Sequence, residues 1–207
     1  MSLESFSLKE GEEWVLRTIH GSHLYGTNTA NSDVDYYWVF TSPNYNRRKI
    51  CRQAVSPNGI DVTVLSLDRF MYFCSIGVPQ ALEALYSHKA DINPKYSHLL
   101  KSIKPGYYQT LDRYERTIFN FAFNTGGRSA RQADKMSPQQ KEKLKRHSLR
   151  LAYNYRQFSE MGTFNPTLPQ STVNYFRSRV SSLKKSKYTF EELLLSIMDP
   201  YHSPSVM

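Results

Sequence analysis

The pattern of apolar and polar positions predicts three strands in the first part of the chain. Residues 14–20 are rich in β-branched and aromatic side chains and end at a glycine, which predicts a first strand. Residues 33–40 have the same character and stop at a Ser-Pro-Asn turn signal. In residues 60–65, the apolar Ile60, Val62 and Val64 alternate with Asp61 and Thr63. We therefore expect a third strand there, with Asp61 and Thr63 on the face opposite its apolar side chains.

Helical spacing replaces this alternation further along the chain. Leucines and aromatic residues at three- and four-residue spacing predict helices over residues 67–74 and 79–86. Ser137 and the proline after it are typical of a helix start, for a helix that ends near residue 161. Ser171 is expected to cap another helix. The pattern also predicts helices over residues 107–124 and 191–198.

The predicted elements divide the chain into two parts. Strands and helices fill the first part and helices fill the second, which predicts the α+β fold class: a small twisted mixed β-sheet with flanking helices, then a helical C-terminal region. The boundary is expected between about residues 87 and 106, where Asn-Pro and Pro-Gly steps interrupt the pattern. We therefore expect one domain over residues 1–95 and a basic helical domain over residues 96–207.

The composition is typical of a globular protein in a reducing compartment. The 207 residues are 40% hydrophobic and 14% aromatic, which is enough to bury a core without disulfides. The two cysteines, Cys51 and Cys74, lack a metal-binding spacing and are expected to be reduced thiols. There is no signal-peptide pattern and no apolar run of about 18 residues. These features predict a cytoplasmic protein that does not interact with membranes.

The net charge of +9 is distributed unevenly along the chain. Residues 1–100 hold 9 of the 27 lysines and arginines and 10 of the 18 acidic residues, a balance of −1. The rest of the chain holds 18 basic and 8 acidic residues, a balance of +10. A positive field confined to the second half predicts a polyanionic partner there, or else a solubilising basic surface on its helices.

Three aspartates on two of the predicted strands are the candidate chemistry. Asp33 and Asp35 are two residues apart, so on one strand both would project from the same face. Asp61 would join them if the two strands are neighbours. Three carboxylates this close repel one another unless cations neutralise them, which predicts two Mg²⁺ or Mn²⁺ ions. Asp68 competes for the third position, although it is more typical of a helix N-cap.

A Gly-Ser pair between the first strand and the acids supplies a complementary feature. Gly21 lets the backbone approach a ligand closely, and Ser22 lies where backbone N–H groups would point outward at a helix start. A polyphosphate could dock there, with Thr27 and Ser32 as further hydroxyl donors. Each feature alone is common in proteins without such a site, whereas their joint occurrence in this order is more specific.

The stretch GSHLYGTNTANSDVDYYWVF resembles the signature of the DNA polymerase β-like nucleotidyltransferase superfamily. That signature is Gly-Ser, a spacer, Asp-x-Asp and a third acid on a later strand. Gly21 and Ser22 match its phosphate-binding pair, Asp33 and Asp35 match its two metal-binding acids, and Asp61 matches the third acid. Within the superfamily the chain is most similar to predicted nucleotidyltransferases of bacteria and many phages, some of which are linked to RNA repair.

The resemblance implies a fold, an activity and partners. It implies a nucleotidyltransferase core, two divalent ions and an NTP donor, with the three acids as catalytic residues. The NMP would pass to a hydroxyl acceptor with release of pyrophosphate, in a bacterium or a phage-infected host cell. The basic second half favours RNA as the acceptor, either tRNA or a 3′ end. Two alternatives stay open: a protein side chain as acceptor, as in modifying toxins, or a non-catalytic binding protein that retains the fold.

Further candidates lie outside this signature. Arg128 and Arg131 have helical spacing after a Gly-Gly pair, which suits a triphosphate or an RNA backbone, or else a solvated helix face. His23 could approach the triphosphate, whereas His20 and His147 are more typical of packing residues. Some tyrosines among the basic residues suit stacking on single-stranded nucleic acid, although each is individually more typical of a core: Tyr107, Tyr108, Tyr114, Tyr153 and Tyr155.

Overall fold

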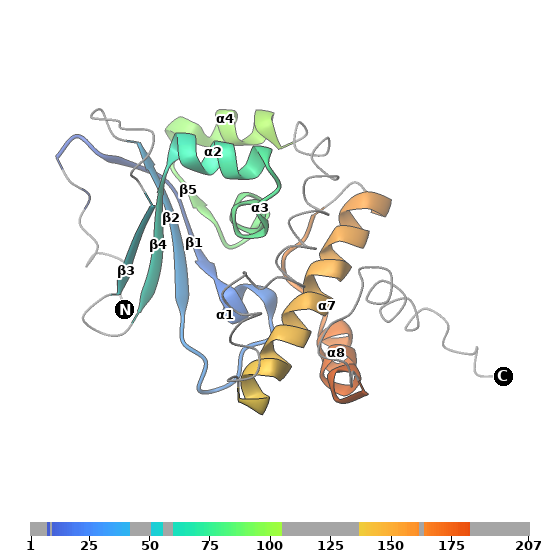
Figure 1. Cartoon of the computed structure of the whole chain (residues 1–207). Coiled ribbons are helices and arrows are strands. Elements are labelled where there is room, and N and C mark those ends of the chain that lie inside the picture. The colour runs from blue at the N-terminus through green and yellow to red at the C-terminus, as the bar shows by residue number, and fades with distance from the viewer. Residues whose placement is uncertain are drawn as a thin grey trace. The chain divides into compact units, whose positions relative to one another are not determined.

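The computed structural model describes residues 8, 10–41, 51–55, 60–104, 137–161 and 164–182. The chain folds into two compact units, whose elements are labelled in Figure 1. The first unit comprises Met1–Thr110 and Asn165–Leu168, and the second comprises Leu111–Phe164 and Pro169–Met207. A short segment from the second half of the sequence therefore belongs to the first unit.

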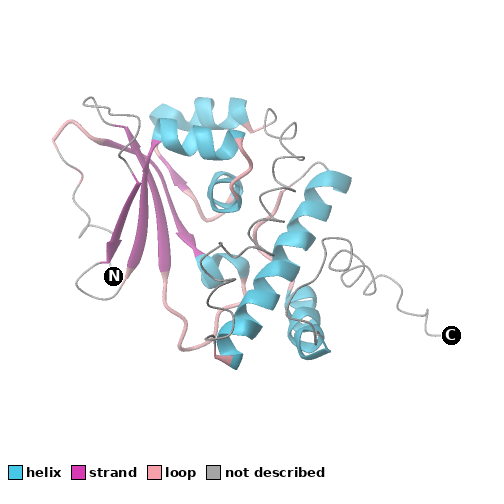
Figure 2. Ribbon diagram, in the orientation of Figure 1, coloured by secondary structure: helices cyan, strands magenta, loops and turns pink. Residues whose placement is uncertain are grey.

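One mixed sheet forms the centre of the first unit (Figure 2). Within the described residues it has five strands in the order β3-β4-β2-β1-β5. Strands β2 and β4 run parallel, and the other neighbours run antiparallel. This mixed sheet with helices confirms the predicted α+β fold class. The strands are β1 (Glu13–His20), β2 (Asp35–Thr41), β3 (Cys51–Val55), β4 (Asp61–Ser66) and β5 (Asp91–Ile92).

The start of β2 corrects the prediction for Asp33. The predicted strands over residues 14–20 and 60–65 are confirmed as β1 and β4, but the strand expected from residue 33 begins at Asp35. The pairing of β1 with β2 ends at His20 and Asp35, because β1 ends at His20 and helix α1 (Gly21–Tyr25) follows it directly. Asp33 therefore lies in the preceding loop and shares no strand face with Asp35.

The two faces of the sheet are covered differently. Trp38, Phe40, Val62 and Val64 form a buried cluster on one face. On the other face, helices α2 (Leu67–Ser75) and α3 (Pro79–Tyr86), which confirm the predicted helices, pack on the sheet (Figure 1). Helix α2 is capped by the Ser66 hydroxyl, which accepts a hydrogen bond from the Arg69 N–H at 3.3 Å. The expectation that Asp68 caps this helix was wrong.

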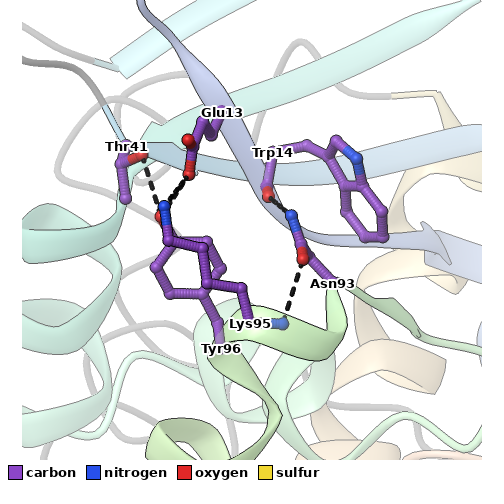
Figure 3. Close-up of polar contacts among 6 residues, drawn as sticks. All are labelled: Glu13, Trp14, Thr41, Asn93, Lys95 and Tyr96. Carbon is purple, nitrogen blue, oxygen red and sulfur yellow. Dashed lines mark hydrogen bonds and ion pairs between the residues drawn. The ribbon is translucent and has the colours of Figure 1, made fainter.

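Helix α4 (Pro94–Ile103) is fastened to β1 by the polar cluster shown in Figure 3. The Asn93 side chain caps α4 by accepting from the Lys95 N–H at 3.1 Å and donates to the Trp14 carbonyl at 2.9 Å. The Glu13 carboxylate accepts from Lys95 Nζ and from the Tyr96 hydroxyl, both at 2.7 Å. The predicted boundary at residue 95 thus falls inside a helix of the first unit, because the Asn-Pro step is a helix start bound to the sheet.

Removal of the Glu13 carboxylate is expected to destabilise the protein more at neutral pH than in acid. Hydrogen bonds from Lys95 and Tyr96 lower the pKa of Glu13 in the folded state. Stability from this group is fully present above the pKa of the unfolded chain and is lost as the pH falls through the lower folded-state pKa. Glu13→Gln should therefore unfold at a lower temperature than the unmodified protein at pH 7, and the difference should be smaller at about pH 3.

Thermal unfolding at both pH values measures this effect. Glu10→Gln is the matched control, because Glu10 is an exposed carboxylate in the turn just before β1. It should change the midpoint little at either pH. The same loss for Glu13→Gln at pH 7 and at pH 3 would contradict a role of the ionised carboxylate.

The second unit contains two described helices, α7 (Pro138–Met161) and α8 (Gln170–Ser182). Ser137 caps α7 as predicted: its hydroxyl accepts from the Gln140 N–H at 3.2 Å, and its own N–H donates to the Gln140 side chain at 2.9 Å. Helix α8 begins at Gln170, so Ser171 lies inside it and is not its cap. The helices predicted over residues 107–124 and 191–198 lie outside the described residues.

Apolar side chains of the second unit pack around these two helices. Phe158 meets Phe164 edge to face with ring centroids 5.7 Å apart, and Tyr153 meets Phe176 in the same way at 6.0 Å. Arg150 is buried, and its guanidinium lies 3.1 Å from the His147 ring nitrogen. No described helix combines the length and the apolar character that crossing a bilayer requires.

Candidate active site

Three neighbouring strands bring polar side chains together at one end of the sheet. The antiparallel pairing of β1 with β2 places His20 opposite Asp35. The parallel pairing of β2 with β4 joins Tyr36 to Val62, so Asp35 and Asp61 stand side by side as the first residues of their strands. Residues in register on adjacent strands point to the same face. The row His20, Asp35 and Asp61 therefore lies along one edge of one face.

This face is the one that the helices cover. Tyr37, two residues after Asp35 on the same face, contacts the Phe70 ring of α2 with centroids 6.2 Å apart. Asp35 and Asp61 are half-buried, whereas Asp33 is exposed in the loop before β2. The structure thus brings two of the three predicted acids together on the strands and leaves the third in the adjoining loop.

Gly21 lies directly against the carboxylate of Asp35. It begins the short helix α1 (Gly21–Tyr25) with a backbone φ of +61°. A Cβ atom at this position would lie 2.0 Å from Asp35 Oδ2, closer than any real contact. Only glycine leaves room for this approach and adopts this φ without strain. The Gly-Ser pair predicted to receive phosphate is therefore adjacent to the acids, with Ser22 as the next residue of α1.

The loop between α1 and β2 is held by local hydrogen bonds. The Ser32 hydroxyl accepts from the Thr29 N–H at 2.8 Å, and the Ser32 carbonyl lies 3.1 Å from the His23 ring nitrogen Nε2. The Thr27 N–H donates to the Ser22 carbonyl at 3.0 Å. Nucleotide binding by Thr27 and Ser32 stays a prediction. Predicted contacts of Arg128 and Arg131 lie outside the described residues.

A buried carboxylate beside this site was missed by the sequence analysis. Glu83 of α3 is fully buried, and its Oε2 accepts a 2.6 Å hydrogen bond from the Tyr25 hydroxyl. The same oxygen lies 3.1 Å from His20 Nε2, a contact by distance that is not a directed hydrogen bond. The His20 ring also packs against the rings of Tyr25 and Tyr37, at 5.8 and 5.5 Å. The available sequence signal was a charged residue between alanines and leucines that are all buried.

The donor set at the edge of the sheet suits a hard divalent cation. Among the described residues, no three His, Cys, Asp or Glu side chains lie close enough together to hold a metal ion by themselves. Mg²⁺ at nucleotide sites is usually bound by one or two carboxylates together with substrate phosphates and water. Asp35 and Asp61 supply such a pair, and the absence of a side chain at Gly21 makes room for the Asp35 carboxylate against the backbone. The residues present therefore fit Mg²⁺ or Mn²⁺.

Comparisons with known proteins give little further information. No known protein family and no curated protein matches the chain. Among solved structures, a nucleotidyltransferase-like protein from Exiguobacterium sibiricum 255-15 is similar with a TM-score of 0.32 and 11% sequence identity. The match covers 94% of this chain and 69% of that chain. Similarity at this level carries no argument about activity, so the function is argued from the site alone.

Proposed function

We propose that the chain is a metal-dependent nucleotidyltransferase that moves an NMP from an NTP to a hydroxyl group of RNA and releases pyrophosphate. The observation that carries the proposal is the close approach of the Gly21 backbone to Asp35, beside Asp61 on the neighbouring parallel strand. A glycine turn that accepts phosphate, next to paired carboxylates that bind a cation, is the arrangement that NTP chemistry requires.

Each residue of the site has a proposed role. Gly21 lets the triphosphate approach the backbone, and the Ser22 hydroxyl and N–H donate to its oxygens. Asp61 accepts the proton of the acceptor hydroxyl, whose oxygen attacks the α-phosphorus. The bond from that phosphorus to the bridging oxygen then breaks, and pyrophosphate leaves with the bonding electrons. Asp33 is proposed to join Asp35 and Asp61 as a metal ligand from the loop before β2.

Two divalent ions held by these carboxylates would neutralise phosphate charge and stabilise the attacking and leaving oxygens. The carboxylates would determine where these ions bind. Asp35 is well suited to this because it is half-buried and its carboxylate lies against the Gly21 backbone. An acid in that position has few orientations open to it, so little ordering would be needed when substrate binds.

RNA is the proposed acceptor because the second half of the sequence carries a large excess of positive charge. The balance of +10 beyond residue 100 suits a polyanion, and Arg128 and Arg131 are proposed to contact phosphate. On the described part of α7, Arg146 and Arg156 are paired with acids four residues away on the same helix. These pairs reduce the charge available there, so RNA contact is expected to rely on other basic residues of the second half.

Incubation with each of the four labelled NTPs, Mg²⁺ and total RNA or cell lysate is expected to label RNA with one preferred nucleotide. Gel separation after nuclease or protease treatment identifies the labelled macromolecule. Label that survives nuclease but not protease would replace RNA by a protein acceptor. If no macromolecule is labelled with Mg²⁺ or Mn²⁺, and calorimetry detects no NTP binding, the proposed activity is wrong.

A further inference from the structure

Both ends of helix α1 contact one oxygen atom of one buried carboxylate. His20 immediately precedes the helix and Tyr25 is its last residue. Their side chains lie 3.1 Å and 2.6 Å from Oε2 of Glu83 on α3. Helix α1 has five residues, too few to be stable without tertiary contacts. The position of the Gly-Ser turn therefore depends on what holds α1 at its two ends.

Glu83 is an unusual residue to find in this place. Its neighbours Ala81, Leu82, Ala84 and Leu85 are all fully or almost fully buried, and so is Glu83. A carboxylate removed from water is costly unless donors surround it. A structural role alone would be filled at lower cost by an apolar side chain. The hydrogen bond from Tyr25 and the close contact with His20 both contribute to stabilising a carboxylate at this position.

Two residues far along the chain, Thr167 and Leu168, also contact α1. The Thr167 hydroxyl donates to the Leu24 carbonyl at 2.8 Å, and the Leu168 N–H donates to the Tyr25 carbonyl at 3.1 Å. Residues 165–168 belong to the same compact unit as α1. These bonds satisfy carbonyls at the end of the helix, but none of them reaches its start. Glu83 joins the start and the end of α1 through one oxygen atom, and the edge-to-face contact between the His20 and Tyr25 rings joins them directly.

We propose that Glu83 is a positioning residue, whose carboxylate fixes both ends of α1 and thereby holds Gly21 and Ser22 against Asp35 for the triphosphate. This inference rests on the proposed function, since it assigns a role in NTP binding. Glu83 does not touch the phosphates or the cation. It acts through His20 and Tyr25, so its loss should weaken NTP binding more than it slows the chemical step on bound NTP.

Tyr25→Phe tests this role with the smallest change, because it removes the donor to Glu83 and keeps the ring. Tyr86→Phe is the matched control: it lies on α3 and removes a hydrogen bond of 2.8 Å from its hydroxyl to the Lys104 carbonyl. Glu83→Gln, of equal size without the charge, is the second variant. Amide hydrogen exchange of the peptide that spans Gly21–Tyr25 is measured for each variant, together with NTP binding, the KM and kcat, and the thermal midpoint.

Tyr25→Phe and Glu83→Gln are expected to speed exchange in α1 about tenfold and to raise the NTP KM by a similar factor, with kcat changed little. Tyr86→Phe should lower the thermal midpoint comparably and leave α1 exchange and the KM unchanged. Exchange in α1 that matches the Tyr86→Phe control would overturn the inference and leave the proposed function standing. Absence of NTP binding by the unmodified protein would overturn the proposed function, and the assigned role with it.

Discussion

Asp35→Asn and Asp61→Asn are each expected to reduce NMP incorporation by about 1,000-fold. Bound metal ions stabilise the charge of the transition state by several kcal/mol, and each 1.36 kcal/mol changes the rate by a factor of ten. The substitution keeps the size of the side chain and removes its charge. Both acids stand at the start of adjacent parallel strands, so each should contribute to the same cation site. Initial rates with labelled NTP and Mg²⁺ measure the loss, and thermal unfolding checks that the variants are folded.

Asp68→Asn is the matched control for these variants. Asp68 is an exposed carboxylate in the first turn of α2, only seven residues after Asp61. Its substitution should leave the rate within about twofold of the unmodified protein, as for most surface changes. Asp33→Asn is expected to lower the rate to an extent similar to Asp35→Asn. Rates for Asp35→Asn and Asp61→Asn that equal that of Asp68→Asn would contradict the assignment of the site.

The parts of the fold that sequence could predict are those set by local periodicity. Alternation identified β4, and three- and four-residue spacing identified α2 and α3, because side-chain direction repeats with a fixed period in each kind of element. The content of β-branched and aromatic residues identified β1. Capping chemistry is equally local, so Ser137 was found. Ser66 was missed as the cap of α2 because the acidic Asp68, two residues later, was expected to cap the helix.

The features that sequence could not predict depend on partners far along the chain. β2 begins at Asp35 because its pairing partner β1 ends at His20, so Asp33 could not be placed from its own neighbours. The Asn-Pro step at residue 93 looked like a domain boundary, yet the Asn93 side chain binds the Trp14 carbonyl, 79 residues away. Contacts between residues so far apart in the sequence cannot be predicted from local spacing.

The candidate site was predicted in part for the same reason. The signature identified Gly21, Ser22 and Asp35 as one group because they are close in sequence. Asp61 could be added only on the condition that its strand, β4, is a neighbour of β2. Glu83 was not singled out by the sequence pattern. A charged residue between buried alanines and leucines was the available signal, but its partners His20 and Tyr25 lie about 60 residues earlier. Only the folded structure joins them.

Alanine at position 21 is expected to reduce NMP incorporation about 100-fold beyond its effect on stability, because a displacement near 1 Å in an active site can cost that much. The added Cβ would lie 2.0 Å from Asp35 Oδ2, so the carboxylate or helix α1 must move.

Gly26→Ala is the matched control: Gly26 ends the same helix with φ +75°, and its added Cβ would meet nothing closer than the Leu168 carbonyl at 3.7 Å. Both alanines force a left-handed backbone that costs about 1–2 kcal/mol. Urea unfolding should therefore show a loss in both variants, whereas the rate per folded molecule should fall only for Gly21→Ala. Equal rates per folded molecule would mean that the contact between Gly21 and Asp35 serves the fold alone, and the close approach that carries the proposed function would then have no part in the reaction.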